Sequence, residues 1–445
     1  MENKLSHAFV EHFNQLLTSL STPSQHYIVA LSGGLDSVVL LHLLTYFRQL
    51  NPVVQLSAHN VNHGLSQNAG KWGDFCADLC QKLAVNFISS EVKLENKART
   101  SLEALARDAR YRCLKDKMNE NDLILTGHHQ DDQLETLLLA LKRGSGGTGL
   151  QGVRVSQSFA EGVLLRPLLI FSRQQLTEYA QFYQLQWIED ESNQNTDFDR
   201  NFIRHQISPL LKQRWPAIAQ SASRSAQLCQ EQQSLLDEVA QQDLATCSSH
   251  CFMSSTLDIS IVSQLSKARR NNVIRYWLKE NKLQYPSSKQ LSILWEEVAL
   301  AEVGKQPKLQ FKTESIQRYQ GLLYIVPNKS LTLPESPVEW SGEQMLWLVE
   351  GRLGVDFSHV DPLISSQYQV TCCLRQHLDS QFNCQPVGRD KARSIKKLLH
   401  EYQVPPWLRE QVVFIFIGDE LAQAIGVWHC HRDQPLTMEL AVYSK

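Results

Sequence analysis

The stretch SGGLDS, residues 32–37, contains the residue types that bind a phosphate group. It follows the apolar run 27–31 and leads into the amphipathic run 37–50, so it should connect a buried strand to a helix. Two adjacent glycines, Gly33 and Gly34, allow successive backbone N–H groups to point at one anion, and the N-terminus of the following helix adds its dipole. The pattern therefore predicts a phosphate-binding loop.

One residue of this loop, Asp36, is negatively charged where phosphate-binding loops of the Walker type carry a lysine. A carboxylate beside a triphosphate is repulsive unless a divalent cation lies between them. Asp36 therefore predicts Mg²⁺ bridging its carboxylate to a pyrophosphate group. Ser32 and Ser37 add hydroxyl donors. The alternative is a turn whose Asp and Ser only cap the helix, but this explains one or two of the six residues.

A second group of ionisable residues lies in GHHQDDQLET, residues 127–136, which follows the apolar run 122–126. His128, Asp132 and Glu135 are spaced i, i+4 and i+7, so a helix would place them on one face. At the end of a strand, three such groups are candidates for catalysis. The alternative is an ordinary solvated helix face.

The elements that must position these residues alternate between strands and helices through the first half of the chain. The expected strands are 27–31, 53–58, 85–92 and 122–126, and the expected helices are 37–50, 66–83, 100–119 and 130–142. Such alternation predicts an α/β domain with a doubly wound parallel sheet, helices on both faces and ligands at the carboxyl ends of the strands. Both groups of ionisable residues lie at that edge.

The alternation ends before a glutamine-rich helical stretch, 199–245, and the proline-containing stretch 327–342 is typical of a linker. Short β-type runs then surround a basic helix at 391–402. We therefore predict a catalytic domain (1–215), a mainly helical middle domain (216–335) and a small α+β C-terminal domain (345–445).

The composition, 42% apolar and 20% charged, is typical of a soluble globular protein. Because no secretory signal or membrane-length apolar run is present, we expect a cytoplasmic protein without membrane contact. Ten cysteines with no CxxC pair predict free thiols rather than a zinc or iron–sulfur site. Nothing marks a symmetric surface, and a homodimer is left open.

The formal net charge of −2 means that any contact with nucleic acid must come from local basic patches. One patch, residues 200–214, has four basic residues and no acid, and the other, 388–411, has six basic residues and three acids. We predict that Arg200 and Arg204 face a phosphate-rich partner. The apolar residues expected to bury the opposite side are Phe198, Phe202 and Ile203. For the second patch, a solvated basic helix is the alternative.

These motifs together resemble, in order and spacing, the bacterial tRNA(Ile)-lysidine synthetases. SGGLDS is similar to the PP-loop of the N-type ATP pyrophosphatases, which split ATP into AMP and pyrophosphate while adenylating a substrate oxygen. The narrower resemblance rests on SGGLDS, HNVNHGL, EALARDARYR, GHHQDDQLET, RGSGGTGL, RPLL, DESNQN, RNFIRHQISPLL and the C-terminal GRDKARSIKKLLHEYQVPPWLRE. It covers about residues 25–215 and 385–430.

The resemblance implies a ligase that attaches the ε-amino group of free L-lysine to C2 of the wobble cytidine in a tRNA(Ile) with a CAU anticodon. AMP is first transferred from ATP to the C2 oxygen, and lysine then displaces AMP, which changes the codon specificity from AUG to AUA. The residue that removes the proton from lysine is left unassigned.

The resemblance also implies roles for particular residues. Those expected to bind ATP are Ser32, Gly33, Gly34, Leu35, Asp36, Ser37 and His63, with Asp36 also holding Mg²⁺. Asp132 and Glu135 are expected to bind lysine and His128 to lie near the adenylate, so the expected catalytic residues are Asp36, His128, Asp132 and Glu135. Those expected to contact tRNA are Arg107, Arg110, Arg200, Arg204, Arg389, Arg393, Lys396 and Lys397. An ion-pair ladder with Glu103 is the alternative for the first two.

Two other functions are compatible with the same loop. A tRNA thiolase would use the same adenylation with sulfur as the nucleophile, and the cysteines closest in sequence are Cys76, Cys80 and Cys113. A non-catalytic tRNA-binding protein with a relic loop would have no need of the acidic residues at 36, 132 and 135. Assays for ATP hydrolysis separate this second alternative from an enzyme.

Overall fold

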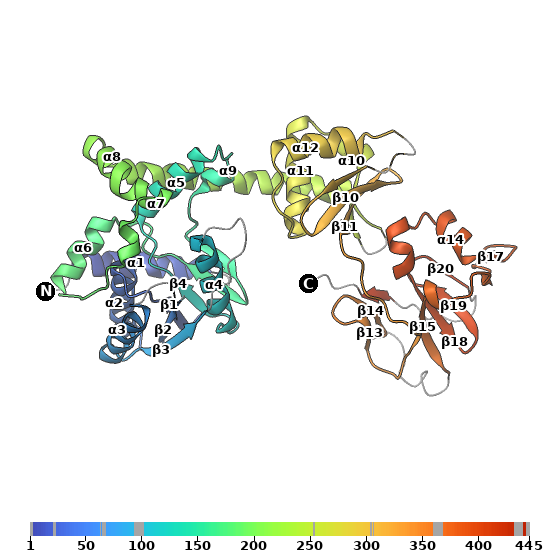
Figure 1. Ribbon diagram of the computed structural model, residues 1–445, viewed down its shortest axis with the longest axis horizontal. Coiled ribbons are helices and arrows are strands. Elements are labelled where there is room, and N and C mark those ends of the chain that lie inside the picture. The colour runs from blue at the N-terminus through green and yellow to red at the C-terminus, as the bar shows by residue number, and fades with distance from the viewer. Residues whose placement is uncertain are drawn as a thin grey trace. The chain divides into compact units, whose positions relative to one another are not determined.

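A computed structural model describes most of the chain. The described residues are 3–20, 24–62, 64, 68–92, 102–251, 254–302, 305, 307–358, 368–430 and 439–441. The chain divides into two compact units, Met1–Ser234 and Leu235–Lys445 (Figure 1).

The first unit is built on a six-stranded sheet with the order β3-β2-β1-β4-β6-β5. Its strands are β1 (His26–Ala30), β2 (Gln55–Asn62), β3 (Asn86–Glu91), β4 (Leu123–Leu125), β5 (Ser156–Phe159) and β6 (Gly162–Leu165). Neighbouring strands are parallel except for the β5–β6 hairpin at one edge. The predicted parallel sheet is confirmed, and β5 and β6 are additional to the four predicted strands.

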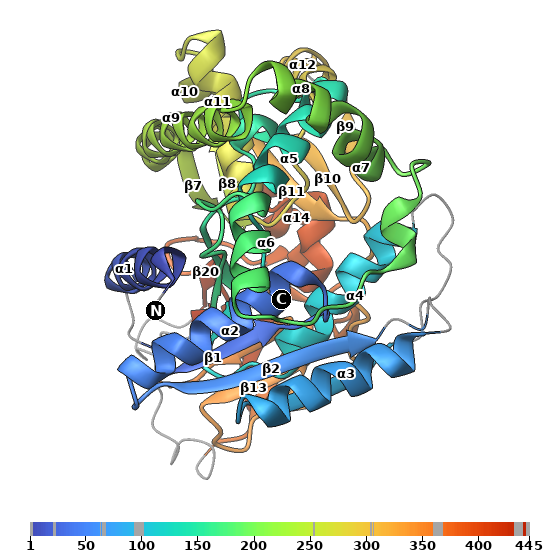
Figure 2. The ribbon, with the colours of Figure 1, turned by 90° about the vertical axis from the view of Figure 1, so that its left-hand side faces the viewer.

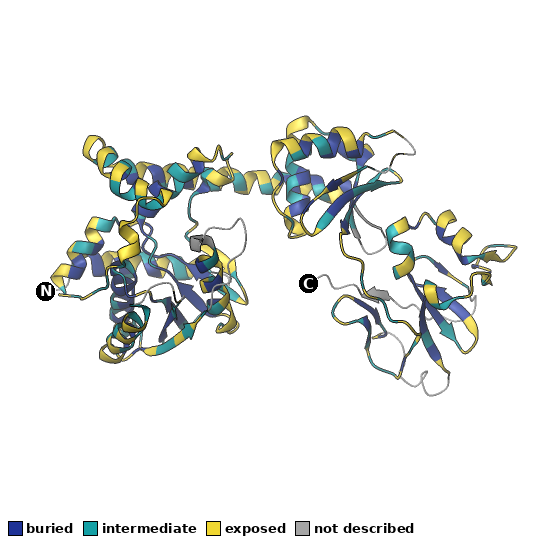
Figure 3. Cartoon of the chain, viewed as in Figure 1, coloured by how far each residue is buried: buried dark blue, intermediate teal, exposed yellow. Residues whose placement is uncertain are grey.

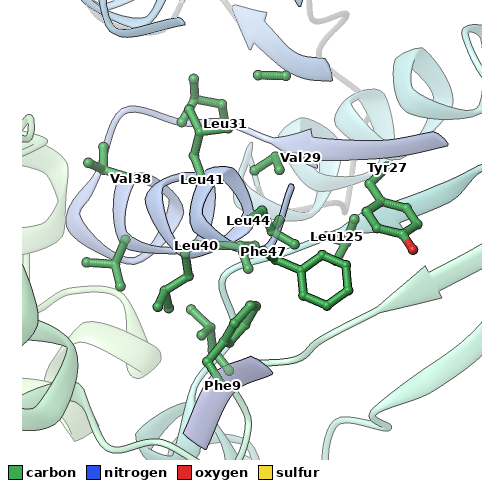
Figure 4. Close-up of a cluster of buried hydrophobic side chains, with 14 of the residues drawn as sticks. Phe9, Tyr27, Val29, Leu31, Val38, Leu40, Leu41, Leu44, Phe47 and Leu125 are labelled. Atoms are coloured by element: carbon green, nitrogen blue, oxygen red, sulfur yellow. The ribbon is translucent and has the colours of Figure 1, made fainter. Parts of the chain in front are cut away.

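Helices cover both faces of this sheet (Figures 2 and 3). They are α1 (Lys4–Thr18), α2 (Leu35–Leu50), α3 (Ala69–Lys82) and α6 (Arg173–Phe182) on one face and α4 (Leu102–Asp116) on the other. Alternate side chains of β1 serve the two faces: Val29 packs in the cluster that contains Phe9 of α1 and Phe47 of α2 (Figure 4), whereas Ile28 packs with Leu114 of α4. Each fully buried side chain of this kind stabilises the fold by about 1.5–3 kcal/mol.

The strand order also fixes where a ligand can bind. From β1 the chain goes to β2 and β3 on one side, and it then returns to place β4 on the other side of β1. The carboxyl ends of β1 and β4 therefore flank a topological switch point, which is where open α/β sheets bind their ligands. SGGLDS follows β1 and GHHQDDQLET follows β4, so both predicted groups meet there.

The rest of the first unit is helical. It comprises α5 (Gln130–Lys142), the short 3₁₀ turns η1 (Gly149–Gln151) and η2 (Glu191–Gln194), α7 (Asp199–Phe202), the π-helix η3 (Ile203–Ile207), α8 (Ser208–Arg214) and the start of α9 (Ile218–Cys247). Leu134 of α5 packs against Ala219 and Ala222 of α9. This packing leaves the N-terminus of α5 at the carboxyl edge of the sheet, directly after β4.

The second unit begins with a mixed region. Its helices are the end of α9, α10 (Ile259–Val262), α11 (Lys267–Glu280), α12 (Ser288–Ile293) and the π-helix η4 (Leu294–Ala299). The prediction of helices here is confirmed, but a five-stranded antiparallel sheet of order β7-β8-β11-β10-β9 accompanies them. Its strands are β7 (Ser248–Cys251), β8 (Ser254–Asp258), β9 (Lys308–Gln310), β10 (Glu314–Tyr319) and β11 (Leu322–Pro327). The fully buried Trp277 of α11 lies in the core between them.

The C-terminal region is rich in strands, as predicted. One sheet contains β12 (Val338–Glu339), β15 (Val370–Leu374), β18 (Val413–Ile417), β19 (Glu420–Ala424) and β20 (Trp428–His429). The smaller sheets contain β13 (Met345–Val349), β14 (Leu353–Asp356) and β21 (Glu439–Ala441), and β16 (Asn383–Cys384) with β17 (Arg393–Ser394). The remaining elements are η5 (Arg375–His377), α14 (Ile395–Glu401) and η6 (Pro406–Gln411), so the basic helix is shorter than predicted. No helix of the described part of the chain is long and apolar enough to cross a bilayer.

Candidate active site

The SGGLDS loop is braced by its two serine side chains. The Ser37 hydroxyl donates to the Gly34 carbonyl (2.9 Å), lies 3.1 Å from the Ser32 hydroxyl and accepts from the Ser32 backbone N–H (3.2 Å). Leu35, the first residue of α2, is buried. Gly34 caps α2 without a side-chain acceptor, so N–H groups in the first turn can reach a ligand, as an anion-binding loop requires.

Segments that are distant in sequence contact the loop and the residue before it. Gly33 has a positive φ of 82°, and its carbonyl accepts from the backbone N–H of Ile188 (2.9 Å). A β-carbon on Gly33 would lie 2.7 Å from Ile188 Cδ1 and 3.2 Å from Cys76 Sγ, so both the conformation and the space require glycine. The Asn60 side chain also donates to the Leu31 carbonyl (2.8 Å) just before the loop.

Asp36 lies in the first turn of α2 with its two carboxylate oxygens in different environments. Oδ2 accepts from the Arg173 guanidinium, while Oδ1 is buried without a hydrogen-bond partner, 3.7 Å from His129 Nε2. Burial raises the pKa of Asp36, against the attraction of His129 and Arg173. An unpartnered carboxylate oxygen beside a phosphate-type loop fits a hard divalent cation. Within the described ranges, no group of three or more His, Cys, Asp or Glu side chains could by itself hold a metal ion.

The two adjacent histidines after β4 have different surroundings. Because α5 begins at Gln130, His128 precedes the helix, and the predicted i, i+4, i+7 spacing is wrong for this residue. His128 Nδ1 pairs with the Thr126 hydroxyl (2.8 Å), and burial lowers the pKa of His128 to about 3, which keeps its ring neutral. His129 is the buried N-cap residue, with Nε2 3.6 Å from Asp132 Oδ2 and 3.7 Å from Asp36 Oδ1. The sequence analysis missed His129, although it is the residue that connects the two acidic positions.

Asp132 and Glu135 are buried on α5 and are held by two arginines of the same chain. Arg200 donates to Glu135 Oε2 and Asp132 Oδ1 (both 2.7 Å), and Arg204 donates to Glu135 Oε1 (2.7 Å) and Oε2 (2.9 Å). Burial alone would raise the pKa of Asp132, but His129, Arg200 and a backbone N–H bring it well below its usual value. Both guanidinium groups point at the carboxylates, because two buried anions require paired cations. The contact of Arg200 and Arg204 with a phosphate-rich partner stays a prediction.

Two further residues of this centre are Arg173, which had no signal in the sequence analysis, and Lys212, which belongs to the basic patch 200–214 but had no predicted role. Lys212 pairs with Asp131 Oδ1, and the backbone N–H of Arg173 donates to Asp131 Oδ2 (2.7 Å). Although burial opposes it, these contacts lower the pKa of Asp131. The two adjacent aspartates in GHHQDDQLET could have predicted such partners, since two adjacent acidic residues at a helix N-terminus need separate partners.

The other predicted residues lie elsewhere or outside the described part. Arg107 is exposed on α4 and stacks over Tyr111 (5.2 Å to the ring centroid), and Arg110 is also exposed. His63 and the side chain of Glu103 lie outside the described residues. Ile203 is buried as predicted, but the prediction was wrong for Phe198 and Phe202, whose side chains are exposed.

In the C-terminal patch, Arg389 and Arg393 both pair with Glu401 (2.6 and 2.8 Å). Lys396 and Lys397 are exposed on α14, and the ion pairs found among the described residues involve neither of them. The positive charge that is available to a partner on this helix is therefore mainly that of the two lysines.

The cysteines close to the loop are not suited to sulfur transfer. Cys76 and Cys80 are buried free thiols on α3, and burial raises the pKa of Cys76 to about 12 and that of Cys80 to about 11. The thiolate is the reactive form of cysteine. Burial likewise raises the pKa of Cys113, so all three thiols named for the thiolase alternative favour the less reactive protonated form.

Gly127, between β4 and the histidines, allows a close backbone contact. A β-carbon there would lie 2.9 Å from the Asp36 carbonyl carbon and oxygen and 3.1 Å from the Ser37 nitrogen. Gly127→Ala should therefore push the two loops apart and lower kcat/KM for ATP about 10- to 100-fold, with a loss of about 1–3 kcal/mol of stability. Steady-state kinetics and thermal unfolding measure both effects.

The matched control is Gly73→Ala on α3, where an added β-carbon meets nothing within 4 Å. Its kinetics should equal those of the wild type. Wild-type kinetics for Gly127→Ala would show that the contact between the two loops is unimportant.

The sheet order, with a glycine loop at the switch point, defines a PP-loop domain, and residues 5–211 match the PP-loop domain family. Residues 257–324 match the TilS substrate-binding domain and residues 374–439 the TilS substrate C-terminal domain. Curated tRNA(Ile)-lysidine synthases are similar over nearly the whole chain. That of Vibrio parahaemolyticus is 39% identical over 92% of this chain and 93% of its own length, and that of Shigella flexneri is 41% identical over 93% of both. The chain belongs to the tRNA(Ile)-lysidine synthase family.

A solved structure of a U34-tRNA thiolase from Methanococcus maripaludis overlaps 51% of this chain and 80% of its own. The TM-score is 0.42 at 16% sequence identity, which is too remote to bear on the reaction.

Proposed function

We propose that this protein ligates free L-lysine to C2 of the wobble cytidine of tRNA(Ile) with a CAU anticodon, converting ATP to AMP and pyrophosphate. The observation that carries the proposal is the position of His129, which lies within 3.7 Å of both Asp36 on the loop and Asp132 on α5. An acidic group suited to a nucleotide and its cation is thus next to an acidic group suited to an amine. Adenylation of an oxygen and attack by an amine need such adjacent sites.

In the first step, the PP-loop residues 32–37 hold the phosphates of ATP. Asp36 would hold Mg²⁺, which supplies charge neutralisation for the pyrophosphate when bound. The backbone N–H groups at the start of α2 orient the phosphate chain, and the buried Leu35 anchors this turn. The C2 oxygen of cytosine is a poor leaving group, and its adenylation makes it a good one.

In the second step, the charged cluster on α5 binds the amino acid. Free lysine carries an α-ammonium and an α-carboxylate group, and the cluster offers both complementary signs. Asp132 and Glu135 bind the ammonium group, and Arg204, whose side chain is 35% exposed, binds the carboxylate. The ε-amino group is then left to attack C2. In the structure these carboxylates pair with Arg200 and Arg204, so lysine would exchange part of these ion pairs for contacts with its own ammonium and carboxylate groups.

The tRNA needs contacts beyond its anticodon base. We assign these to Arg107 and Arg110 on α4 and to the C-terminal patch, whose exposed lysines bind phosphates. The three-module division into 1–215, 216–335 and 345–445, with tRNA contacts in the second and third modules, is supported by separate family matches within each span. A cytoplasmic location is also part of the proposal, and it is supported by the similarity to bacterial tRNA(Ile)-lysidine synthases.

The double substitution Lys396→Ala/Lys397→Ala should weaken tRNA binding and reduce the slope of log K against log salt by up to about 2, since each phosphate contact adds about 0.9. Filter binding between 50 and 200 mM salt, over which two such contacts change the affinity about tenfold, measures both quantities. The control is Lys71→Ala/Lys82→Ala, two exposed lysines of α3. An unchanged affinity and slope would remove α14 from the RNA interface.

The function is tested with unmodified tRNA(Ile) bearing a CAU anticodon, ATP, Mg²⁺ and labelled lysine, with methionine tRNA as the control. We expect label in the isoleucine tRNA alone, accompanied by equal amounts of AMP and pyrophosphate. Release of AMP without incorporation of lysine would support the adenylation step and would exclude lysine as the nucleophile.

A further inference from the structure

The PP-loop lacks a cation of its own. SGGLDS contains no lysine or arginine, although a departing pyrophosphate group carries several negative charges. Backbone N–H groups and the dipole of α2 supply only partial charges. Mg²⁺ held by Asp36 would neutralise part of the charge on the leaving group, and a positive side chain that adds to this neutralisation has to come from an element outside the loop.

Four basic side chains surround the acidic centre, but they are not equivalent. Arg200, Arg204 and Lys212 are paired with carboxylates of α5, which lie beyond the loop. Arg173 is the one of the four whose guanidinium is bound to the loop itself, through Asp36. Of these four cations, it is therefore the one closest to the place where the nest of N–H groups would hold phosphate.

We propose that Arg173 is a catalytic residue that binds the pyrophosphate leaving group during adenylation, an inference that rests on the function proposed above. The backbone of Arg173 is fixed at the start of α6 by Asp131, which accepts its N–H at 2.7 Å, and by the capping box of Ser172 and Gln175. The side chain, in contrast, is 43% exposed and reaches solvent beside the loop.

The position of Arg173 relative to the loop is set by the packing of α6 on α2. The Tyr179 hydroxyl of α6 bonds to His42 Nδ1 of α2 (2.8 Å), and Leu176 and Ala180 are buried in the same core. Both helices begin at the carboxyl edge of the sheet, so the guanidinium is carried on a rigid support. Such support is what a preorganised charge in an active site requires.

The partner of Arg173 is the residue that ATP would engage. Asp36 is the proposed ligand of Mg²⁺, and a bound cation would take over its carboxylate. Arg173 would then leave the Asp36 carboxylate and bind phosphate instead. Its planar guanidinium group can form two hydrogen bonds with phosphate oxygens. The pair seen in the structure thus keeps the guanidinium in place before ATP arrives.

The step in which Arg173 acts is the first of the two. The cytidine O2 forms a bond to the α-phosphorus while the bond from that phosphorus to the bridging oxygen breaks, and the electron pair leaves with pyrophosphate. Arg173 stabilises the negative charge that develops on the leaving group, and it neither gains nor loses a proton. When lysine later displaces AMP from C2, pyrophosphate has no part in the reaction.

The test compares Arg173→Gln and Arg173→Lys with the wild-type enzyme, using inhibition by magnesium pyrophosphate and by AMP as separate readouts. For Arg173→Gln we expect a fall of about 100-fold in the rate of pyrophosphate release without lysine, and a rise of about 10-fold or more in the Ki for pyrophosphate. The Ki for AMP should stay within about twofold, because AMP does not contain the leaving group. Arg173→Lys should recover part of both losses.

The matched control is Arg48→Gln at the far end of α2, where the arginine donates to the carbonyls of Leu83 and Ala84 (both 2.8 Å). It should leave both Ki values unchanged. An unchanged Ki for pyrophosphate in Arg173→Gln would overturn the proposal, and so would equal weakening of pyrophosphate and AMP, since that indicates a distorted loop. Neither inhibition measurement involves lysine, so failure here is distinct from failure of the proposed ligation.

Discussion

Replacing Asp36 with asparagine should lower the rate of adenylation roughly 10²- to 10³-fold while leaving the protein at least as stable as the wild type. The loss follows because the amide cannot supply the anionic oxygen that faces the phosphate-bound cation. The stability follows from burial, which raises the pKa of Asp36. The ionised carboxylate therefore costs folding free energy as the pH rises above the unfolded pKa of 3.8, and the neutral amide removes this cost at neutral pH.

Single-turnover release of pyrophosphate at saturating ATP measures the first effect, together with a Mg²⁺ titration whose midpoint should rise. Thermal unfolding at pH 7 measures the second. Asp116→Asn, at the exposed end of α4, is the control and should match the wild type in both assays. Wild-type rates in Asp36→Asn would show that Asp36 does not serve the nucleotide.

The same change at Asp132 should have the opposite effect on stability. Asp132→Asn leaves Arg200 with one ionic partner fewer in a buried position, which should cost about 3 kcal/mol of unfolding free energy. The pKa of Asp132 is lowered in the folded state, so its ionisation stabilises the fold above the unfolded pKa of 3.8, and this contribution disappears as the pH falls toward the lower folded value. The difference in unfolding free energy between Asp132→Asn and the wild type should therefore become smaller at acidic pH.

Kinetically, Asp132→Asn should raise the KM for lysine by about 10- to 100-fold, the equivalent of one hydrogen bond between charged groups. The KM for ATP should change far less. Asp243→Asn is the matched control, because Asp243 is also a buried aspartate paired with an arginine, Arg269, but lies in the second unit. It should lose stability and keep the KM for lysine. Equal increases in both KM values for Asp132→Asn would place α5 in the nucleotide site.

The sequence was sufficient to predict the parallel sheet, the loop after β1 and the acidic cluster after β4, because each depends on local patterns. Apolar runs of strand length mark the sheet, and two glycines before a helix mark the loop. The placement of His128 on the helix was wrong for a local reason as well. This placement depended on where α5 begins. An error of one or two residues in the predicted start of the helix decides whether His128 or His129 is taken as the residue that caps it.

The basic residues that pair with the acidic residues could not be predicted from the sequence. Arg200 meets Asp132 across 68 positions of sequence, and Arg173 meets Asp36 across 137. No periodicity connects such residues, since their contact is produced by the packing of whole helices. The exposed phenylalanines, Phe198 and Phe202, illustrate the same limit: their spacing fits a buried face, but the arginines between and beside them occupy the inward side.

The contact between Gly33 and Ile188 has a consequence for how the protein is made. A ribosome releases β1 and the complete SGGLDS motif early, yet β4, which flanks the switch point, and Ile188, which closes the glycine turn, are translated much later. A nascent chain that has reached only β3 therefore contains every residue of the motif but not the nucleotide site. ATP can act as a ligand that stabilises folding only after residue 188 has been synthesised.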